Sequence, residues 1–217
     1  MLSELNILSG SNVNERLKNL NAHFYEIFME KDARPTFNDK FIFFDMNKHY
    51  KGITLPFPER FMHICSIEDK NYSMFPCNND FTFALCSNKC QMSSALSSFK
   101  KINRTECLYR MARIHWIPEI IILANGNDEN IYKWIKEKTL KKGKKEKIQF
   151  IRYKDEKTDY VILLEIVERK KEIINYKFKT AYPVFLKNNI LEFNADYEKY
   201  QKKTKEKSAQ KSTLLSE

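Results

Sequence analysis

The chain has 217 residues, of which 42% are hydrophobic and 13% aromatic, and this composition excludes an intrinsically disordered protein. The length fits one domain and is enough to bury a core without disulfides. The 38 Lys and Arg against 28 Asp and Glu give a formal net charge of +10. Such an excess favours a polyanionic partner, nucleic acid first and an anionic membrane surface second. The Lys-, Asn- and Ile-rich composition is also typical of an AT-rich genome, so codon usage is the alternative explanation of the charge.

The sequence predicts a cytoplasmic protein without a membrane partner. No stretch is apolar enough to span a bilayer. The segment Met1–Gly10 lacks the basic region and apolar run of a signal peptide. Without export, the five cysteines are expected to be reduced, and their odd number argues against a disulfide framework.

The first part of the chain predicts a long helix, two short strands and a second helix. Apolar residues at helical spacing predict a helix over Val13–Lys31, and Asn12 followed by Glu15 is typical of a capping box at its start. Pro58 suits the first turn of the second helix, which carries His63. Two stretches between the helices predict strands: Lys40–Asp45 and Gly52–Phe57.

The middle of the chain predicts mainly helices. A short strand is expected at Phe81–Leu85. The apolar pattern then predicts a helix over Thr105–Asn125, interrupted at Pro118, and a further helix over Glu129–Leu140. A lysine-rich turn, Lys141–Lys147, follows that helix.

The last part of the chain predicts three consecutive strands that form an antiparallel meander. These strands are Lys147–Tyr153, Tyr160–Val167 and Ile174–Phe185. Strict alternation predicts two faces for the third strand, with Tyr176, Phe178, Thr180 and Tyr182 on one face and Lys177, Lys179 and Ala181 on the other.

Together these elements predict an α+β fold with N-terminal helices packed on a small antiparallel sheet. We expect a single domain over 1–197, made of a helical and strand part, 1–105, and a helix-plus-meander part, 106–197. The Lys-, Ser- and Gln-rich segment 198–217 predicts a helical extension that frays into a disordered basic tail.

Basic side chains cluster beside the first strand of the meander. Lysines in such a cluster can neutralise phosphates and release counterions, and the alternative is a solvated surface loop. The residues for which we predict nucleic-acid binding are Arg113, Lys141, Lys142, Lys144, Lys145, Lys147, Lys179 and Tyr182.

His63 is the candidate for chemistry on RNA. Metal-independent RNA cleavage needs a base for the 2′-OH, an acid for the leaving 5′-oxygen and cations around the phosphate. Histidine titrates near neutrality and suits the first two roles, while Arg152 and Lys177 can supply cations and Thr180 a hydrogen bond. The structural alternatives are a core histidine, the solvated face of a sheet and an ordinary strand threonine.

Cysteines offer a different interpretation. The spacing of Cys77, Cys86 and Cys90, with Cys107 further along, allows a four-cysteine zinc site, although the chain has no close C-x-x-C pair. Buried free thiols are the alternative. The sequence therefore predicts no metal site and, with four glycines and no phosphate-binding loop, no cofactor.

Several segments, in order, resemble a known superfamily. Phe61-Met62-His63-Ile64 follows a strand, Arg113-Ile-His-Trp116 opens a helix with Ile-Pro-Glu-Ile-Ile, Tyr160-Val-Ile-Leu-Leu-Glu forms a strand, and Thr180-Ala-Tyr-Pro183 ends the next. This series resembles the phage-encoded nucleases of the barnase, EndoU, colicin D and RelE superfamily. The resemblance covers most of 22–185. The segment 71–98 has no counterpart, and Pro118 lies inside the Trp-Ile helix rather than after it.

The resemblance implies a small twisted antiparallel sheet covered by N-terminal helices, and a metal-independent endoribonuclease, such as a toxin or phage effector, whose products carry a 2′,3′-cyclic phosphate. It implies His63 as acid or base, Arg152 as a phosphate clamp and Thr180 as a hydrogen-bond donor. The expected partners are RNA, with tRNA as a candidate, and an antitoxin or immunity protein. The alternative is a non-catalytic nucleic-acid-binding or protein-interaction module of phage or mobile-element origin.

Overall fold

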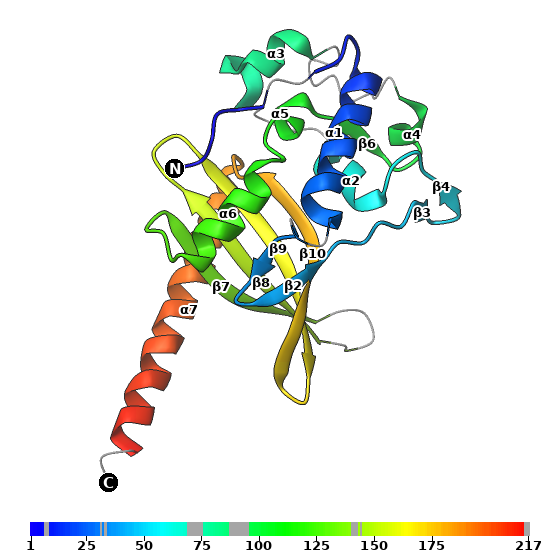
Figure 1. The fold of residues 1–217 in the computed structure, drawn as a ribbon. Helices are drawn as coiled ribbons and strands as arrows, with labels where there is room; N and C mark the ends of the chain where they lie inside the picture. The colour runs from blue at the N-terminus through cyan, green and yellow to red at the C-terminus, as the bar shows by residue number, and fades with distance from the viewer. Residues whose placement is uncertain are drawn as a thin grey trace.

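The computed structural model describes residues 1–6, 9–30, 32, 34–68, 76–86, 96–139, 143 and 145–214, without the side chains of residue 79 and of residues 207–214. The fold is of the α+β class, as the sequence predicts. Helices from the N-terminal half cover one side of a central sheet, and the C-terminal helix leaves the domain as a projecting rod (Figure 1).

The central sheet has six strands in the order β1-β2-β10-β9-β8-β7. Their bounds are Thr36–Phe37 for β1, Lys40–Phe43 for β2, Ile131–Thr139 for β7, Lys145–Lys154 for β8, Asp159–Arg169 for β9 and Glu172–Pro183 for β10. Strands β8, β9 and β10 pair antiparallel in sequence order, which confirms the predicted meander. The sheet as a whole is mixed, because β2 lies parallel to β10.

Strand β7, Ile131–Thr139, takes the place of the helix predicted over Glu129–Leu140, so that prediction is wrong. Ile131, Trp134 and Ile135 fit a helical period, but the residues alternate across the sheet just as well, with Trp134 buried on one face. This segment pairs with β8 from Ile131 to Thr139 as the edge strand of the sheet. The short apolar pattern fits both a helix and a strand, and pairing with the neighbouring strand favours the strand.

The main core lies between the sheet and the N-terminal helices. Helix α1 spans Val13–Met29, close to its predicted bounds, and buries Leu17, Leu20, Phe24 and Phe28 against the core. Each such side chain contributes about 1.5–3 kcal/mol by leaving water. Asn12 caps the helix as predicted, but Glu15 accepts from the main chain and hydroxyl of Ser11, one residue before the expected capping-box partner.

Short elements fill the chain between β2 and β7, and α2 among them carries His63. In chain order they are β3 (His49–Tyr50), β4 (Ile53–Thr54), α2 (Glu59–Ile64), β5 (Ser66–Glu68), η1 (Pro76–Asn79), α3 (Phe81–Leu85), α4 (Ser97–Lys100), β6 (Arg104–Glu106), α5 (Leu108–Met111) and α6 (Trp116–Asn125). Strands β3 and β4 pair with each other, as do β5 and β6. Pro58 precedes α2, as predicted.

Two predicted elements in this region are wrong. Phe81–Leu85 is helix α3 rather than a strand, because the side chain of Asp80 accepts the main-chain N–H of Thr82 and caps a helical turn. The predicted helix over Thr105–Asn125 divides into β6, α5 and α6. Pro118 lies in the first turn of α6, where a missing N–H is tolerated, so it does not interrupt the helix.

A β-bulge in β10 changes the predicted faces of that strand. Register shifts between Phe178 and Thr180, which leaves Lys179 as the extra residue. Before the bulge Phe178 faces the main core, and after it Ala181 does so. Thr180 pairs with Leu163 and Tyr182 with Val161, two residues of the opposite face, so both lie on the same face as Lys177.

Helix α7, Lys187–Leu214, covers part of that second face. Phe193 packs with Trp134 and Phe150 in a smaller core between α7 and the sheet. The helix runs through most of the predicted extension, 198–217, and the position at which it ends in a disordered tail stays a prediction. Among the described residues, no helix is long and apolar enough to cross a membrane.

Candidate active site beside His63

Helix α2 presents His63 on its polar side. Phe61, Met62 and Ile64 of this helix are buried, which leaves Glu59, Arg60 and His63 on the remaining side. The imidazole Nδ1 of His63 lies 4.0 Å from a carboxylate oxygen of Glu59, one helical turn earlier. The same carboxylate group lies 3.4 Å from Nε of Arg60. The sequence of α2 thus places an acid, a base and a cation side by side.

Two arginines cover the free edge of β10 beside this helix. Strand β2 pairs with β10 as far as Lys177, and beyond that point arginines meet the edge. Nη1 of Arg60 donates to the carbonyl oxygen of Lys179 at 2.9 Å, and Nη2 of Arg110 donates to that of Ala181 at 2.9 Å. Side-chain donors therefore satisfy the main-chain acceptors that a further strand would otherwise take.

Arg104 and Arg110 also hold the start of β5. Nε of Arg104 donates to Oγ of Ser66 at 2.6 Å, and its Nη2 donates to the carbonyl oxygens of Ser66 and His63 at 2.8 and 3.2 Å. Nη1 of Arg110 donates to the carbonyl oxygen of Ser66 as well. Both arginines are largely buried. These acceptors are uncharged, so these particular hydrogen bonds position the guanidinium groups without placing a carboxylate against them.

Two cavities meet at His63, and they share His63, Glu68 and Arg104. The first has a volume of about 440 Å³ and is further lined by Tyr50, Glu59, Arg60, Ile102 and Asn103. The second has a volume of about 280 Å³ and is further lined by Ile67, Arg110, Thr180, Tyr182, Pro183, Phe185, Leu186 and Asn189. His63 therefore lies between two hollows that different segments of the chain enclose.

The second cavity contains residues with buried donors that lack a partner. Within the described part of the chain, neither Oγ1 of Thr180 nor Nε of Arg110 has a hydrogen-bond partner, although both atoms are buried. A buried unpaired donor is unfavourable by about 1–3 kcal/mol. An anionic oxygen bound in this cavity would face positively charged side chains, and two of the residues that line it carry such unpaired donors, so the cavity has the chemistry of an oxyanion site.

His63 is neutral at physiological pH. Burial lowers the pKa of its imidazole, and the nearby charges of Arg104, Arg110 and Arg60 lower it further, to about 3. A neutral imidazole accepts a proton, so His63 in this state can act as a base. A bound phosphate would offset the arginine charges, and the pKa of His63 would then rise.

The structure brings three of the predicted site residues together, whereas the predicted catalytic residues Arg152 and Lys177 do not line a cavity with them. His63, Thr180 and Tyr182 line the second cavity. Arg152 lines neither cavity with His63. Its Nε donates to Asp159 at 2.7 Å, its Nη2 lies 2.5 Å from the other oxygen of the same carboxylate, and its Nη1 donates to Oδ1 of Asn194 in α7 at 2.8 Å.

Most of the remaining predicted cations that the structure describes are paired with acids. Arg113 donates to Asp80 at 2.7 Å and stacks on the ring of Tyr109, with its guanidinium carbon 3.5 Å from the ring centroid. The paired lysines are Lys145 with Glu137, Lys147 with Glu168, and Lys179 with Glu146 and Glu165. Lys177 lies opposite Glu165 and Phe43 in the sheet register. Lys141, Lys142 and Lys144 lie outside the described residues.

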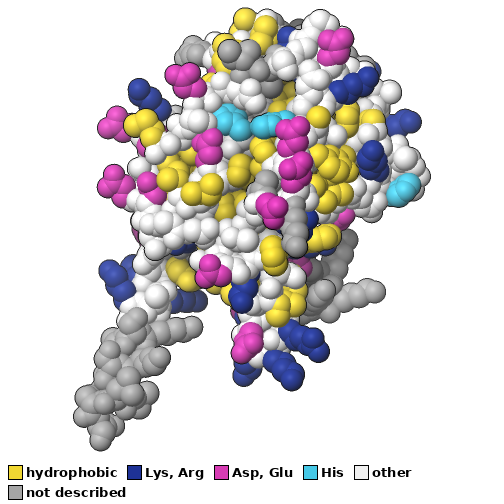
Figure 2. Space-filling view, viewed as in Figure 1, with side chains coloured by type: hydrophobic (Ala, Val, Ile, Leu, Met, Phe, Trp, Pro, Cys, Tyr) yellow, Lys and Arg dark blue, Asp and Glu magenta, His cyan; other side chains and the backbone are white. Residues whose placement is uncertain are grey.

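The face shown in Figure 2 does not carry one continuous basic patch in its described part. Lys and Arg side chains are spread around its outline, with acidic side chains between them and hydrophobic ones toward the middle. The net charge of +10 therefore does not by itself mark a binding surface there. The arrangement of individual side chains around a cavity is the better guide to a functional site.

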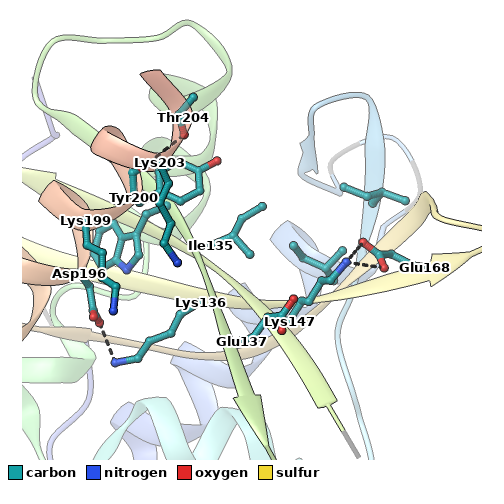
Figure 3. A pocket seen from close by; sticks show the side chains of 13 residues that line it. Ile135, Lys136, Glu137, Lys147, Glu168, Asp196, Lys199, Tyr200, Lys203 and Thr204 are labelled. Atoms are coloured by element: carbon teal, nitrogen blue, oxygen red, sulfur yellow. Dashed lines mark hydrogen bonds and ion pairs between the residues drawn. The ribbon is translucent and has the colours of Figure 1, made fainter. Parts of the chain in front are cut away.

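A larger cavity lies elsewhere, between α7 and the sheet (Figure 3). It has a volume of about 880 Å³, and Trp134, Ile135 and Tyr200 contribute to its lining. Lys136 in this groove is held between Glu192 and Asp196, with both contacts at 2.7 Å. The groove contains no histidine and its sheet lysines are paired, so it offers less chemistry than the His63 cavities.

Three cysteines line a small cavity beside β6. Cys77, Cys86 and Cys107 line it, and burial raises the pKa of Cys107 to about 11. Cys90, the fourth residue of the zinc interpretation, lies outside the described residues. In the part of the chain that is described, no group of three or more His, Cys, Asp or Glu side chains is placed to hold a metal ion. The described thiols are free.

Sequence reasoning missed three arginines and one asparagine of the site. Arg60 could have been found, because it precedes His63 by three residues and so shares its side of a helix. Arg104, Arg110 and Asn189 reach the cavities through tertiary contacts that no spacing indicates.

Comparisons of the chain with family models, with curated proteins and with solved structures each find no match.

Proposed function

We propose that the chain is a metal-independent endoribonuclease that binds an RNA phosphodiester beside His63. The observation that carries the proposal is the pair of buried donors without partners, Oγ1 of Thr180 and Nε of Arg110, on residues that line one cavity with a neutral histidine. A phosphate in that cavity would accept hydrogen bonds from the donors and meet the positive charge of the arginines. Two of the four described thiols, those of Cys65 and Cys107, have pKa values raised by burial, which makes them poorer nucleophiles.

In the proposed reaction His63 accepts the proton of the 2′-hydroxyl. The 2′-oxygen then forms a bond to phosphorus, and the bond from phosphorus to the 5′-oxygen breaks. The products are a 2′,3′-cyclic phosphate and, after protonation of the leaving oxygen, a 5′-hydroxyl. Formation of the imidazolium is favoured in this complex because the phosphate offsets the charges that lower the pKa of His63.

The surrounding residues take the remaining roles. Arg110 and Arg104, which both line the cavity, stabilise the extra negative charge on the phosphorane, and Thr180 donates to a non-bridging oxygen. Tyr182 lines the same cavity, and burial raises the pKa of its phenol. The phenol therefore holds its proton at neutral pH and is our candidate for the acid that protonates the 5′-oxygen. This set replaces Arg152 and Lys177 of the sequence-based hypothesis.

The test is incubation of the purified protein with total RNA and with a tRNA pool in EDTA, with the ends of the fragments identified. We expect fragments with 2′,3′-cyclic phosphate and 5′-hydroxyl ends, and a rate about 10²- to 10⁴-fold lower for His63→Ala. His23→Ala is the matched control, because His23 is an exposed histidine on α1. A divalent-metal requirement, or an unchanged rate in His63→Ala, contradicts the proposal.

One observation favours the non-catalytic alternative. Arg60, Arg104 and Arg110 all donate to main-chain carbonyl groups, so they also serve as structural supports of α2 and β5. A nucleic-acid-binding module would use the same charges to hold a phosphate without cleaving it. Salt-sensitive binding of RNA that stays intact in the same incubation would support this function instead.

A further inference from the structure

The two cavities beside His63 differ in what encloses them. The cavity with Thr180 is walled by Tyr182, Phe185 and Leu186, two aromatic side chains and one aliphatic. The other cavity is walled by Tyr50 of β3 and by Ile102 and Asn103 before β6. Each hollow therefore combines an aromatic side chain with polar groups, the composition that unpaired nucleobases meet in RNA-binding proteins.

Asn189 gives the Thr180 cavity a group that can distinguish bases. Its side-chain amide carries a donor and an acceptor, the pattern that pairs with a base edge. Within the described part of the chain this amide is not engaged in any hydrogen bond. Asn189 lies in the first turn of α7, which Phe193 anchors to the sheet, so the position of its side chain is fixed by a packed element.

Asn103 has the corresponding place in the other cavity. It lies at the turn before β6 with a positive φ of 53°, a conformation that asparagine tolerates better than most residues. Next to it, Arg104 lines both cavities and binds the carbonyl oxygen of His63. A substrate that occupied both hollows would therefore pass His63 and Arg104 at their junction.

We propose that the two cavities are subsites for the two nucleotides on either side of the scissile phosphate, and that Asn189 reads the base in the Thr180 subsite. The inference rests on the proposed function and adds to it the substrate class, which is single-stranded RNA with a preferred base at one position. A base in a duplex has its pairing edge occupied, so Asn189 and the wall of Tyr182 and Phe185 can engage an unpaired base only.

The test measures binding separately from cleavage. Short single-stranded oligonucleotides with 2′-O-methyl groups, which lack the attacking hydroxyl, are varied at one base and titrated against the wild-type chain and against Asn189→Ala. We expect the wild type to prefer one base by about tenfold and Asn189→Ala to lose most of that preference. Asn188→Ala is the matched control, because Asn188 is the exposed neighbour in the same helical turn and lines neither cavity.

The outcomes separate this inference from the proposed function. A base preference that depends on Asn189, with no cleavage of natural RNA, supports the subsites and contradicts the nuclease. Cleavage of RNA with an equal base preference in wild type and Asn189→Ala supports the nuclease and overturns the role of Asn189. Equal binding of all bases by the wild type, or tighter binding of duplex than of single strands, overturns the inference.

Discussion

Arg110 and Arg152 are two buried arginines beside the same sheet, and they have opposite electrostatic surroundings. The guanidinium of Arg152 contacts both oxygens of Asp159 under α7, so a carboxylate cancels its charge. Arg110 donates to the carbonyl oxygens of Ser66 and Ala181. These bonds position its guanidinium group, and among the residues that the structure describes no carboxylate forms an ion pair with it.

The difference between the two regions lies in the charge of the acceptor. A neutral carbonyl group positions a guanidinium group without neutralising its positive charge. A carboxylate also positions the guanidinium group, but its negative charge neutralises the positive one. The effect is visible on His63, where Arg104, Arg110 and Arg60 contribute to its lowered pKa. A buried arginine that binds main-chain acceptors is therefore a better candidate for phosphate binding than one that binds an aspartate.

The largest expected effect comes from breaking the ion pair of Arg152. Arg152→Met leaves Asp159 as a largely buried carboxylate without its partner, and we expect the free energy of unfolding to fall by about 3–5 kcal/mol. Because Arg152 lies outside the cavities, RNA cleavage per folded molecule should stay at the wild-type level. Urea unfolding and the cleavage assay measure the two quantities.

Arg110→Met is the matched comparison for that variant. It should lower cleavage per folded molecule as well as stability, since it removes the uncancelled charge from the cavity. Equal losses of activity in the two variants would show that the two arginines do not differ in the way the structure indicates.

A smaller effect is expected from pH, through His63. The pKa of about 3 in the folded chain lies below the ordinary value of 6.5, so the unfolded chain binds the proton more strongly between these values. Stability is therefore fully present above pH 6.5 and is lost as the pH falls toward 3, with a decrease of about 2 kcal/mol from pH 7 to pH 5. Unfolding curves of the wild type and of His63→Asn at both pH values measure this contribution.

Inorganic phosphate sharpens the same prediction. By offsetting the arginine charges it should raise the pKa of His63, which NMR titration of the imidazole reports directly. The exposed His23 is the internal reference, because it lies on α1 and lines neither cavity. A pKa of His63 that stays the same with phosphate would indicate that the anion does not bind in this cavity.

The smallest expected change in stability is at Thr180, and its sign is informative. Thr180→Val keeps the shape of the side chain and removes a buried hydroxyl without a partner, so the free energy of unfolding should rise by about 1 kcal/mol. Binding of RNA should weaken in the same variant, because the hydroxyl is proposed to donate to phosphate. A loss of stability together with unchanged RNA binding would assign Thr180 to the fold alone.

Local patterns predicted the parts of the fold that local interactions determine. The cap at Asn12, the proline before α2 and the meander from β8 to β10 could all be predicted from the sequence. Strand β7 and helix α3 could not, because pairing with β8 and the cap by Asp80 decide between structures that the apolar pattern allows equally.

The candidate site was predictable to a similar extent. The sequence predicts His63, Thr180 and Tyr182 as site residues from their side-chain chemistry and the elements that carry them, and the structure places them around one cavity. Their meeting depends on the bulge at Lys179, which alternation along the strand cannot reveal. Arg152 was chosen for its residue type, and its partner Asp159 lies only seven residues away, across the turn that the meander predicts. That proximity was a signal that its charge would be cancelled.

The main-chain acceptors of Arg60 and Arg110 also affect how these contacts would appear among related sequences. The carbonyl groups of Lys179 and Ala181 are present whatever side chain those positions carry. A substitution at either position therefore creates no pressure on the arginine, and the two positions need not change together. Correlated substitution, the usual trace of a contact, would mark the pair of Arg152 and Asp159 and pass over the arginines around the cavity.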